Sequence, residues 1–253
     1  MAHVSYSEIK NWHKCPYYHK LTYIDRIRLF KGNEFTAFGT ALHNICENML
    51  LEKEIPSFDV EFLNQLKELP EDLELRKDLV EQMRSQAPQI IPEVLPALKK
   101  YFGEYEVISA EEVLMEKIED FEATEYDFKG YIDLVLKTAD GKYHIIDWKT
   151  CSWGWHSKKK ADKMILYQLV FYKYYFCSKH DISPENVEVY FGLLKRTAKK
   201  NNVELFKVTS GQKRTQNAIN FLTRALYNIN NKNYVKNKAA CRDCEFYKTK
   251  FCK

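Results

Sequence analysis

The sequence predicts an α/β protein in which a mixed central β-sheet is flanked by helices. Three strand-like runs follow one another, at 105–118, 126–138 and 142–150. Helical patterns precede and follow them, at 38–51 and 159–179. Two more strand-like runs and a helix close the pattern, at 187–197, 204–209 and 211–229. This order suits a mixed sheet covered by helices.

Composition limits the class of protein. The chain has 253 residues with 45% hydrophobic residues, which is enough for a packed core. The net charge is only +4, so any basic binding surface must be local. The N-terminus has no apolar segment of the signal-peptide kind, and the apolar run at 164–177 is too short to span a bilayer. We expect a soluble, cytoplasmic protein without a membrane partner.

The first helix is expected to begin at a capping box, with Ser5 as the cap and Glu8 reaching back to it, and to end near Cys15. The helix at 38–51 has one apolar face, because its large apolar residues recur at spacings of three and four. Residues 54–100 are charged, helix-patterned and interrupted by prolines. They predict a helical insertion.

Two acids and a lysine interrupt otherwise apolar strands. Asp133 lies in GYIDLVL and Asp147 in HIIDWKT, and the turn at 139–141 contains Asp-Gly, a hairpin signal. In such a hairpin the two acids lie on neighbouring strands. Lys149 projects on the same side as Asp147, because residues two apart on a strand face the same way. The two carboxylates and the ammonium therefore converge.

This convergence suits phosphodiester chemistry. Hard oxygen ligands at one point favour Mg²⁺ or Mn²⁺, which binds phosphate oxygens and lowers the pKa of a bound water. Lys149 would orient or deprotonate that water, or stabilise the transition state. The alternative is an ordinary Asp–Lys pair at the end of a strand. Glu116, on the preceding strand, is a further candidate ligand, or part of a solvated face.

The motif G-x-I-D, followed by I-I-D-W-K-T, is similar to the core of the PD-(D/E)XK nucleases. Two outlying motifs resemble the RecB-like branch, which includes AddB and CRISPR-associated exonucleases. They are G-T-A-L-H, with Gly39 and His43, and Q-L-V-F-Y, with Gln168 and Tyr172. The resemblance implies a restriction-endonuclease-like fold over one domain, 1–253.

The resemblance also implies roles for single residues. Asp133, Asp147, the backbone carbonyl of Trp148 and His43 would hold the metal, and Lys149 would position the water. Gln168 and Tyr172 would steady the lysine region and touch DNA. Glu116 is the best match to the glutamate that the family carries on its first strand, with Glu111 and Glu112 as competitors. The structural alternative places His43, Gln168 and Tyr172 in the core.

Three cysteines lie close to the C-terminus, and a fourth ends the first helix. They are Cys241, Cys244, Cys252 and Cys15. A C-x-x-C pair can hold one metal or cluster. The RecB-like nucleases with a 4Fe–4S cluster share this layout, so the resemblance implies a cluster that joins the segments 1–20 and 238–253. Zinc and unligated thiols are the alternatives. The other cysteines, 46, 151 and 177, are expected to pack in the fold.

Basic and aromatic residues follow two strands and suggest a path for nucleic acid. Trp153 and Trp155 precede lysines 158–160, and Lys195, Arg196, Lys199 and Lys200 follow the next strand. Such residues contact phosphates and stack on unpaired bases, although a charge run is usually an ordinary solvated loop.

The expected function is that of a metal-dependent DNA exonuclease acting on single-stranded or frayed ends in recombination, repair or processing. It would act alone or with a helicase or recombination partner, because no G-x-x-x-x-G-K-[ST] motif is present. The alternatives are a structure-specific or nicking endonuclease on the same core, and a non-catalytic DNA-binding module.

Overall fold

A computed structural model describes residues 2–119 and 126–253. Its strands are β1 (Ala2–Ser5), β2 (Tyr105–Lys117), β3 (Tyr126–Thr138), β4 (Tyr143–Cys151), β5 (Val187–Lys195) and β6 (Val203–Val208). Its longer helices are α1 (Tyr6–Lys14), α3 (Glu34–Leu50), α4 (Phe58–Lys67), α5 (Lys77–Ile90), α6 (Val94–Phe102), α8 (Lys163–His180) and α9 (Gln212–Asn230). Short helical turns are α2 (Pro16–His19), η1 (Lys20–Ile24), η2 (Ile91–Glu93), α7 (Ser157–Lys160), η3 (Pro184–Asn186) and η4 (Lys238–Asp243).

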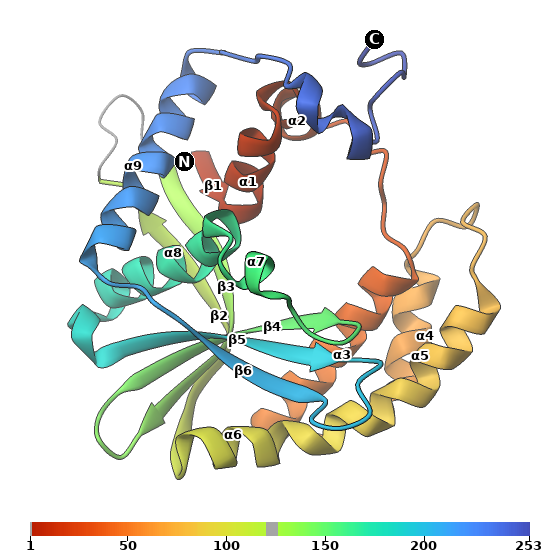
Figure 1. Cartoon of the computed structure of the whole chain (residues 1–253), viewed down its shortest axis with the longest axis vertical. Coiled ribbons are helices and arrows are strands. Elements are labelled where there is room, and N and C mark those ends of the chain that lie inside the picture. Colours follow the sequence, from red (N-terminus) through yellow and green to blue (C-terminus); the bar gives the residue numbers. More distant parts are fainter. Residues whose placement is uncertain (1, 120–125) are drawn as a thin grey trace.

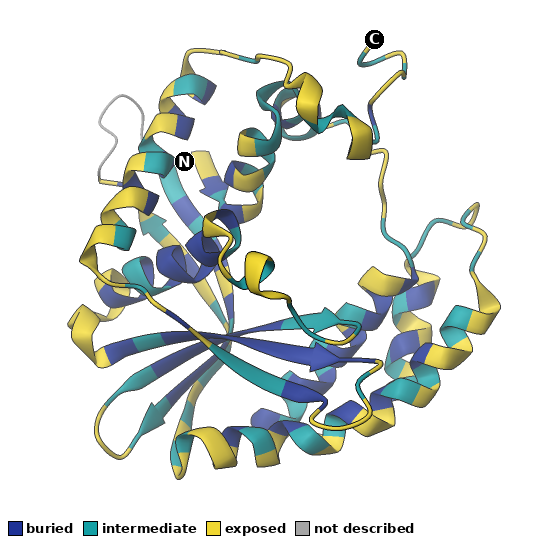
Figure 2. Cartoon of the chain, viewed as in Figure 1, coloured by how far each residue is buried: buried dark blue, intermediate teal, exposed yellow. Residues whose placement is uncertain are grey.

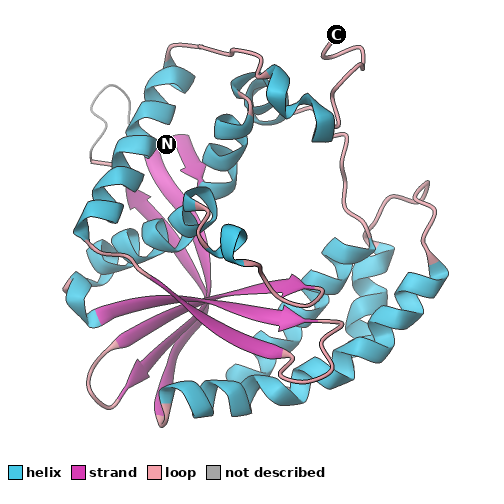
Figure 3. Cartoon of the chain, viewed as in Figure 1, coloured by secondary structure: helices cyan, strands magenta, loops and turns pink. Residues whose placement is uncertain are grey.

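The strands form one mixed sheet in the order β1-β3-β4-β5-β6, with β2 paired to β3 (Figure 3). β2 runs antiparallel along almost all of β3. The other edge of β3 is therefore shared: β1 pairs with residues 126–129, and β4 pairs with residues 134–137. Residues 130–133 lie in the gap between these two partners. This gap positions the site described below.

Helices cover both faces of the sheet (Figure 1). α1, α8 and α9 pack on one face, and α3 to α6 pack on the other. Strand residues alternate between the two cores: Ile145 packs with the first group of helices and Ile146 with the second. Most residues of β4 and β5 are consequently buried, while the outer faces of the helices are largely exposed (Figure 2).

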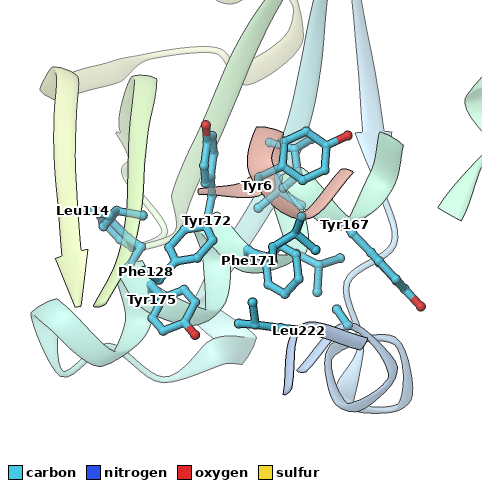
Figure 4. Packing of buried hydrophobic residues seen from close by; sticks show 14 of the residues in the cluster. Tyr6, Leu114, Phe128, Tyr167, Phe171, Tyr172, Tyr175 and Leu222 are labelled. Carbon is cyan, nitrogen blue, oxygen red and sulfur yellow. The ribbon is translucent and has the colours of Figure 1, made fainter. Parts of the chain in front are cut away.

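Aromatic residues dominate the core on the α8 side (Figure 4). Phe128 of β3 stacks on Tyr175 of α8 with ring centroids 4.4 Å apart. Gly130, two residues further along β3, lies against Tyr172, and a Cβ atom there would come within 2.9 Å of its ring. The glycine of the GYID motif therefore lets α8 approach the strand closely.

The structure matches most predicted elements and changes several of them. The Asp-Gly turn is confirmed, with the amide of Gly141 donating to Thr138 O at 2.9 Å. Ser5 caps α1, but the Glu8 side chain contacts His19 at 2.8 Å instead of reaching back. The predicted helix 159–179 is two helices, because Asp162 caps a new one at Lys163. The short strand β1 was missed, because four residues carry too little pattern.

The helical insertion is attached to α3 by an ion pair. Arg76, at the start of α5, donates to the buried Glu34 from its Nε at 3.2 Å and its Nη2 at 3.1 Å, and its backbone amide donates at 2.8 Å. These bonds favour the charged carboxylate and lower the pKa of Glu34 to about 2.

Glu34→Gln should lower the melting temperature at neutral pH, because the amide cannot replace the charged partner of Arg76. A carboxyl whose pKa is lower in the folded state stabilises the fold above its unfolded pKa, and this contribution disappears as the pH falls towards about 2. The difference between wild type and variant should therefore shrink below about pH 4.5. Urea unfolding followed by circular dichroism between pH 7 and pH 3.5 measures it. A gap that stays constant with pH would contradict this role for the carboxylate.

No helix of the described residues is long and apolar enough to cross a membrane.

Candidate active site

The predicted acids meet where β3 and β4 separate. The last ladder pair before the gap is Leu134–Ile146, so Asp133 and Asp147 are the next residues on each strand. Here the strands diverge, and the backbone amide of Trp148 donates to Asp133 Oδ2 at 2.6 Å instead of to a ladder partner. The hairpin thus places the two carboxylates side by side, as the sequence predicts.

The backbone is irregular at this level of the sheet. The β2–β3 ladder pairs Ala110 with Leu134 and Glu112 with Ile132, but it skips Glu111 and Asp133. Glu111 has a left-handed backbone, with φ of 51°. The alternation of β3 also changes here, because Ile132 packs on the α8 side and Leu134 on the α3 side. Distortions of this kind re-aim a side chain and are common beside active sites.

Asp147 is buried, and its carboxylate is held by two side chains. Gln168 of α8 donates its Nε2 to Asp147 Oδ1 at 2.7 Å, and the same nitrogen lies 3.1 Å from the hydroxyl of Tyr172. Lys149 Nζ lies 2.5 Å from Asp147 Oδ2. Each oxygen of the Asp147 carboxylate therefore has one polar neighbour, the Gln168 amide or the Lys149 ammonium.

Burial and mutual charge set the protonation of the site. Burial, together with the charge of Asp147, raises the pKa of Asp133 well above its usual value. Burial also raises the pKa of Asp147, against the opposing charge of Lys149. Burial lowers the pKa of Lys149, but the charges of Asp147 and Asp133 outweigh burial and raise it. These charges consequently favour the protonated form of Lys149 in this arrangement.

His43 approaches the acids from α3, on the other side of the sheet. Its Nδ1 lies 3.6 Å from Asp133 Oδ2. Burial and the charge of Lys149 lower its pKa to about 4, so the imidazole is neutral at pH 7 and suited to bind a metal. Gly39, one turn earlier, lets the helix approach β4, since a Cβ there would lie 3.4 Å from Thr150 Oγ1.

The Trp148 side chain is a core residue, and its backbone faces the site. Its indole is 2% exposed and lies against Gly192 of β5, where a Cβ atom would come within 2.2 Å of the ring. The packed indole fixes the peptide units on either side, including the carbonyl that the resemblance assigns as a metal ligand.

The structure does not bring Glu116 to this site. Glu116 pairs with Phe128 on β3, five residues from Asp133, which is about 17 Å along the strand. Glu111 takes the expected place, and burial together with the charges of Glu47 and Asp147 raises its pKa. The strand pattern favoured Glu116 because nothing in the sequence signals the distortion at Glu111.

Lys10 of α1 is a site neighbour that the sequence did not suggest. Burial and the charge of Lys149 are the main causes that lower its pKa. Its helix packs against α8, the helix that carries Gln168. Tyr6, one turn before Lys10, donates its hydroxyl to Met164 O of α8 at 2.7 Å. The cap at Ser5 was the only signal for this helix, and it says nothing about what the helix faces.

The donors around the acids fit a divalent cation. Among residues 2–119 and 126–253, no group of three or more His, Cys, Asp or Glu side chains is arranged to hold a metal. Two carboxylates with a backbone carbonyl are nevertheless the kind of set that Mg²⁺ uses, since it keeps most of its waters. A cation here would also relieve the repulsion that raises the pKa of Asp133.

The four predicted cysteines line one cavity of about 360 Å³ between the two ends of the chain. The cavity joins the α1–α2 turn to the C-terminal segment, which lie close together in Figure 1. Cys15 Sγ accepts from the amide of Asn237 at 3.3 Å, and Lys14 Nζ donates to Asp243 O at 2.9 Å. Within the described part of the chain the thiols do not form a metal-ligand group as they stand. The four thiols are of the kind that binds a metal or cluster. Their sulfur atoms, however, do not lie close enough together to form one ligand set.

The predicted nucleic-acid surface is only partly present. Trp153 is 79% exposed, as a stacking residue would be. Trp155 instead packs on Phe191 of β5, with ring centroids 4.9 Å apart, and is partly buried. Lys160 and Lys195 both contact Glu204 of β6, at 2.5 and 3.3 Å, so this one carboxylate offsets part of the predicted charge.

A solved structure shares the fold of this chain, and a family model matches its sequence. A crystal structure of a proposed exonuclease from Eubacterium rectale superposes with a TM-score of 0.59 at 13% identity, covering 96% of this chain and 86% of that one. The structure of SSO0001 is 15% identical, with a TM-score of 0.39, covering 83% of this chain and 92% of that one. No curated protein matches the chain. The family model of the PD-(D/E)XK nuclease superfamily matches residues 3–249, so this chain belongs to that superfamily and is a nuclease.

Proposed function

We propose that this nuclease is a metal-dependent DNA exonuclease of the RecB-like type, with residues 1–253 as one nuclease domain. The observation that carries the proposal is the meeting of Asp133, Asp147 and Lys149 at the point where β3 and β4 separate. Gln168, Tyr172 and His43 surround the same point, as the RecB-like resemblance implies. The reaction would belong to DNA recombination, repair or processing, alone or beside a helicase or recombination partner.

Asp133, Asp147, the Trp148 carbonyl and His43 would hold Mg²⁺ or Mn²⁺. When bound, such an ion holds a phosphate oxygen and lowers the pKa of a bound water. Lys149, whose Nζ lies 2.5 Å from Asp147 Oδ2, would orient the water and stabilise negative charge on the phosphate. Gln168 keeps Asp147 in position through a 2.7 Å bond, and Tyr172 supports the Gln168 amide.

We assign the family's first-strand glutamate to Glu111 instead of Glu116. Glu111 occupies the level of Asp133 that the ladder skips, and its charge contributes to the raised pKa of Asp133. Glu111→Gln should therefore reduce cleavage, while Glu116→Gln should leave it at the wild-type rate.

Cleavage of defined DNA tests the proposal. End-labelled single-stranded and duplex DNA should be degraded from an end when Mg²⁺ or Mn²⁺ is present, and EDTA should stop the reaction. Circular single-stranded DNA should stay intact. Cutting of the circle would replace the exonuclease with an endonuclease on the same core. Metal-independent binding without any cleavage would favour a non-catalytic module.

Trp153→Ala should weaken binding to single-stranded DNA by about fivefold or more, because a stacked aromatic ring contributes about 1–3 kcal/mol per base. The melting temperature should not change, since this side chain is 79% exposed. Trp155→Ala is the matched comparison: it should lower the melting temperature instead, because its ring packs on Phe191. Fluorescence anisotropy and thermal melting separate the two effects. Equal affinity in wild type and Trp153→Ala would rule out the stacking role.

We further propose that Cys15, Cys241, Cys244 and Cys252 hold a 4Fe–4S cluster, with zinc as the alternative. The shared cavity of about 360 Å³ supports this. It would join the two ends of the chain, and metal binding would contribute to folding there. Anaerobically purified protein should be brown and contain iron. Cys244→Ser should lose the colour and melt at a lower temperature, whereas Cys177→Ser, outside the cavity, should keep the colour. Colourless protein that contains zinc would decide for the alternative.

A further inference from the structure

Arg196 is a mostly buried cation at the end of β5. The residue is 8% exposed. Its backbone amide donates to Cys151 O at 2.8 Å, which fixes it beside the last residue of β4. Cys151 is two residues beyond Lys149 along β4. Arg196 therefore lies at the same end of the sheet as Lys149.

The guanidinium is held by α3 and by the helical insertion. Nη1 donates to Gln86 Oε1 of α5 at 2.8 Å. The guanidinium carbon lies 5.2 Å from the ring centroid of Phe35 and 5.7 Å from that of Phe38. Three side chains thus fix its orientation, yet all three are neutral.

Two other arginines nearby have acidic partners. Arg76 contacts the same Phe35 ring, but it pairs with Glu34. Arg84, on the same helix as Gln86, pairs with Asp59. In the described ranges, 2–119 and 126–253, Arg196 forms no ion pair with an acid. No side-chain nitrogen of Arg196 is both fully buried and without a partner. Its remaining N–H groups can therefore contact solvent.

Burying a guanidinium without a counter-charge is costly. Burial accordingly lowers the pKa of Arg196. The Gln86 amide and the rings of Phe35 and Phe38 hold the guanidinium in this unfavourable position. Such an arrangement is expected when a bound ligand supplies the anion. A phosphate group matches the planar guanidinium in geometry and charge.

The position along α3 relates Arg196 to the candidate active site. Phe35 contacts Arg196, and His43 contacts Asp133. These two residues are eight positions apart on one helix, which is about 12 Å. This distance corresponds to a few nucleotides of a single strand. Thr197 N donates to Ser152 O at 2.8 Å, which also places the exposed Trp153 beside this segment.

We propose that Arg196 binds a backbone phosphate of the single-stranded DNA substrate, a few nucleotides from the scissile bond, and that the helical segment 54–100 positions it through Gln86. Arg196 is thus a binding residue and Gln86 a positioning residue. The inference rests on the proposed function, because it takes the strand that the site cleaves as the ligand.

The test measures the salt dependence of binding. A short labelled oligothymidylate is titrated with protein in EDTA, so that no cleavage occurs, at several salt concentrations. Arg196→Gln should weaken binding about tenfold and reduce the slope of log affinity against log salt by about 0.7, the loss of one phosphate contact. Arg196→Lys should restore the slope. Gln86→Ala should keep the slope and weaken binding less. In cleavage assays Arg196→Gln should raise KM more than it lowers kcat.

Arg84→Gln is the matched control. Arg84 lies on α5, the helix that carries Gln86, and Asp59 already neutralises its charge. It should leave affinity and slope unchanged. A purely structural Arg196 would lower the melting temperature of Arg196→Gln without changing the slope, and this result would overturn the inference. If Arg196→Gln does not fold, Arg196→Lys decides: it should bind several-fold more weakly because the fork geometry is lost, and wild-type affinity would overturn the inference.

The binding assay and the cleavage assay fail separately. Wild-type protein that binds the strand but never cleaves it would refute the proposed function and leave the phosphate contact measurable. Wild-type protein that cleaves, with an unchanged slope in Arg196→Gln, would refute the contact alone. Inorganic phosphate should not compete at concentrations similar to that of the strand; effective competition would show capture of a free anion instead.

Discussion

Lys149→Ala should reduce cleavage by about 100- to 1,000-fold, the usual effect of removing a group that stabilises charge in a transition state. Its ammonium lies 2.5 Å from Asp147 Oδ2, at the meeting point of the two strands. Strand binding in EDTA should stay within about threefold of wild type, because Asp147 already pairs with this ammonium and offsets its charge. Single-turnover cleavage of end-labelled DNA, together with anisotropy, measures both quantities.

Lys179→Ala controls for the loss of a lysine. Lys179 pairs with Glu112 at 3.0 Å on the outer strand β2, away from the acid pair. It should cleave at the wild-type rate. Wild-type cleavage by Lys149→Ala would refute the assignment of the site, and a parallel loss of strand binding would show that the lysine acts in substrate binding instead.

Asp133→Asn should abolish metal-dependent cleavage and raise the melting temperature in metal-free buffer. The folded protein raises the pKa of Asp133, because burial and the charge of Asp147 oppose ionisation. An ionised Asp133 therefore destabilises the fold at neutral pH, and the amide removes this cost while keeping an oxygen for the Trp148 amide. Each kcal/mol that is relieved corresponds to about 2–4 °C for a chain of this size.

The sign of the pH dependence follows from the raised pKa. The cost of Asp133 is absent when the carboxyl is protonated in both states, so the gap between wild type and variant should close as the pH falls. Added Mg²⁺ should raise the melting temperature of the wild type and not of Asp133→Asn. Asp127→Asn removes an acid six residues away on the same strand and serves as the control. A variant that melts below the wild type at every pH would contradict the stored repulsion.

The candidate site could be predicted largely because local patterns encode it. The Asp-Gly turn determines which residues of β3 and β4 are neighbours, so Asp133 and Asp147 had to lie at one level. The period of two places Lys149 on the side of Asp147. Gln168 and Tyr172 share one face of α8 for the same kind of reason.

Other parts depended on contacts that no local pattern contains. Glu111, and not Glu116, lies beside the acids because the backbone leaves the regular strand conformation at Glu111. Trp155 is partly buried because β5 supplies Phe191 as its packing partner. These choices follow from packing between separate elements, and propensity over a few residues cannot express them.

The sequence by itself determined most of the elements and the acid–lysine hairpin, because each depends on residues within one turn, strand or helix face. Its motifs taken together indicated the nuclease superfamily. Only the tertiary structure decided which charges remain unpaired. Lys160 and Lys195 share the single carboxylate of Glu204, while Arg196 meets Gln86, 110 residues away in the chain, and no acid in the described residues. A sequence gives only the number of charged residues. The free energy of each charge depends on its burial and on the partner within a few ångströms.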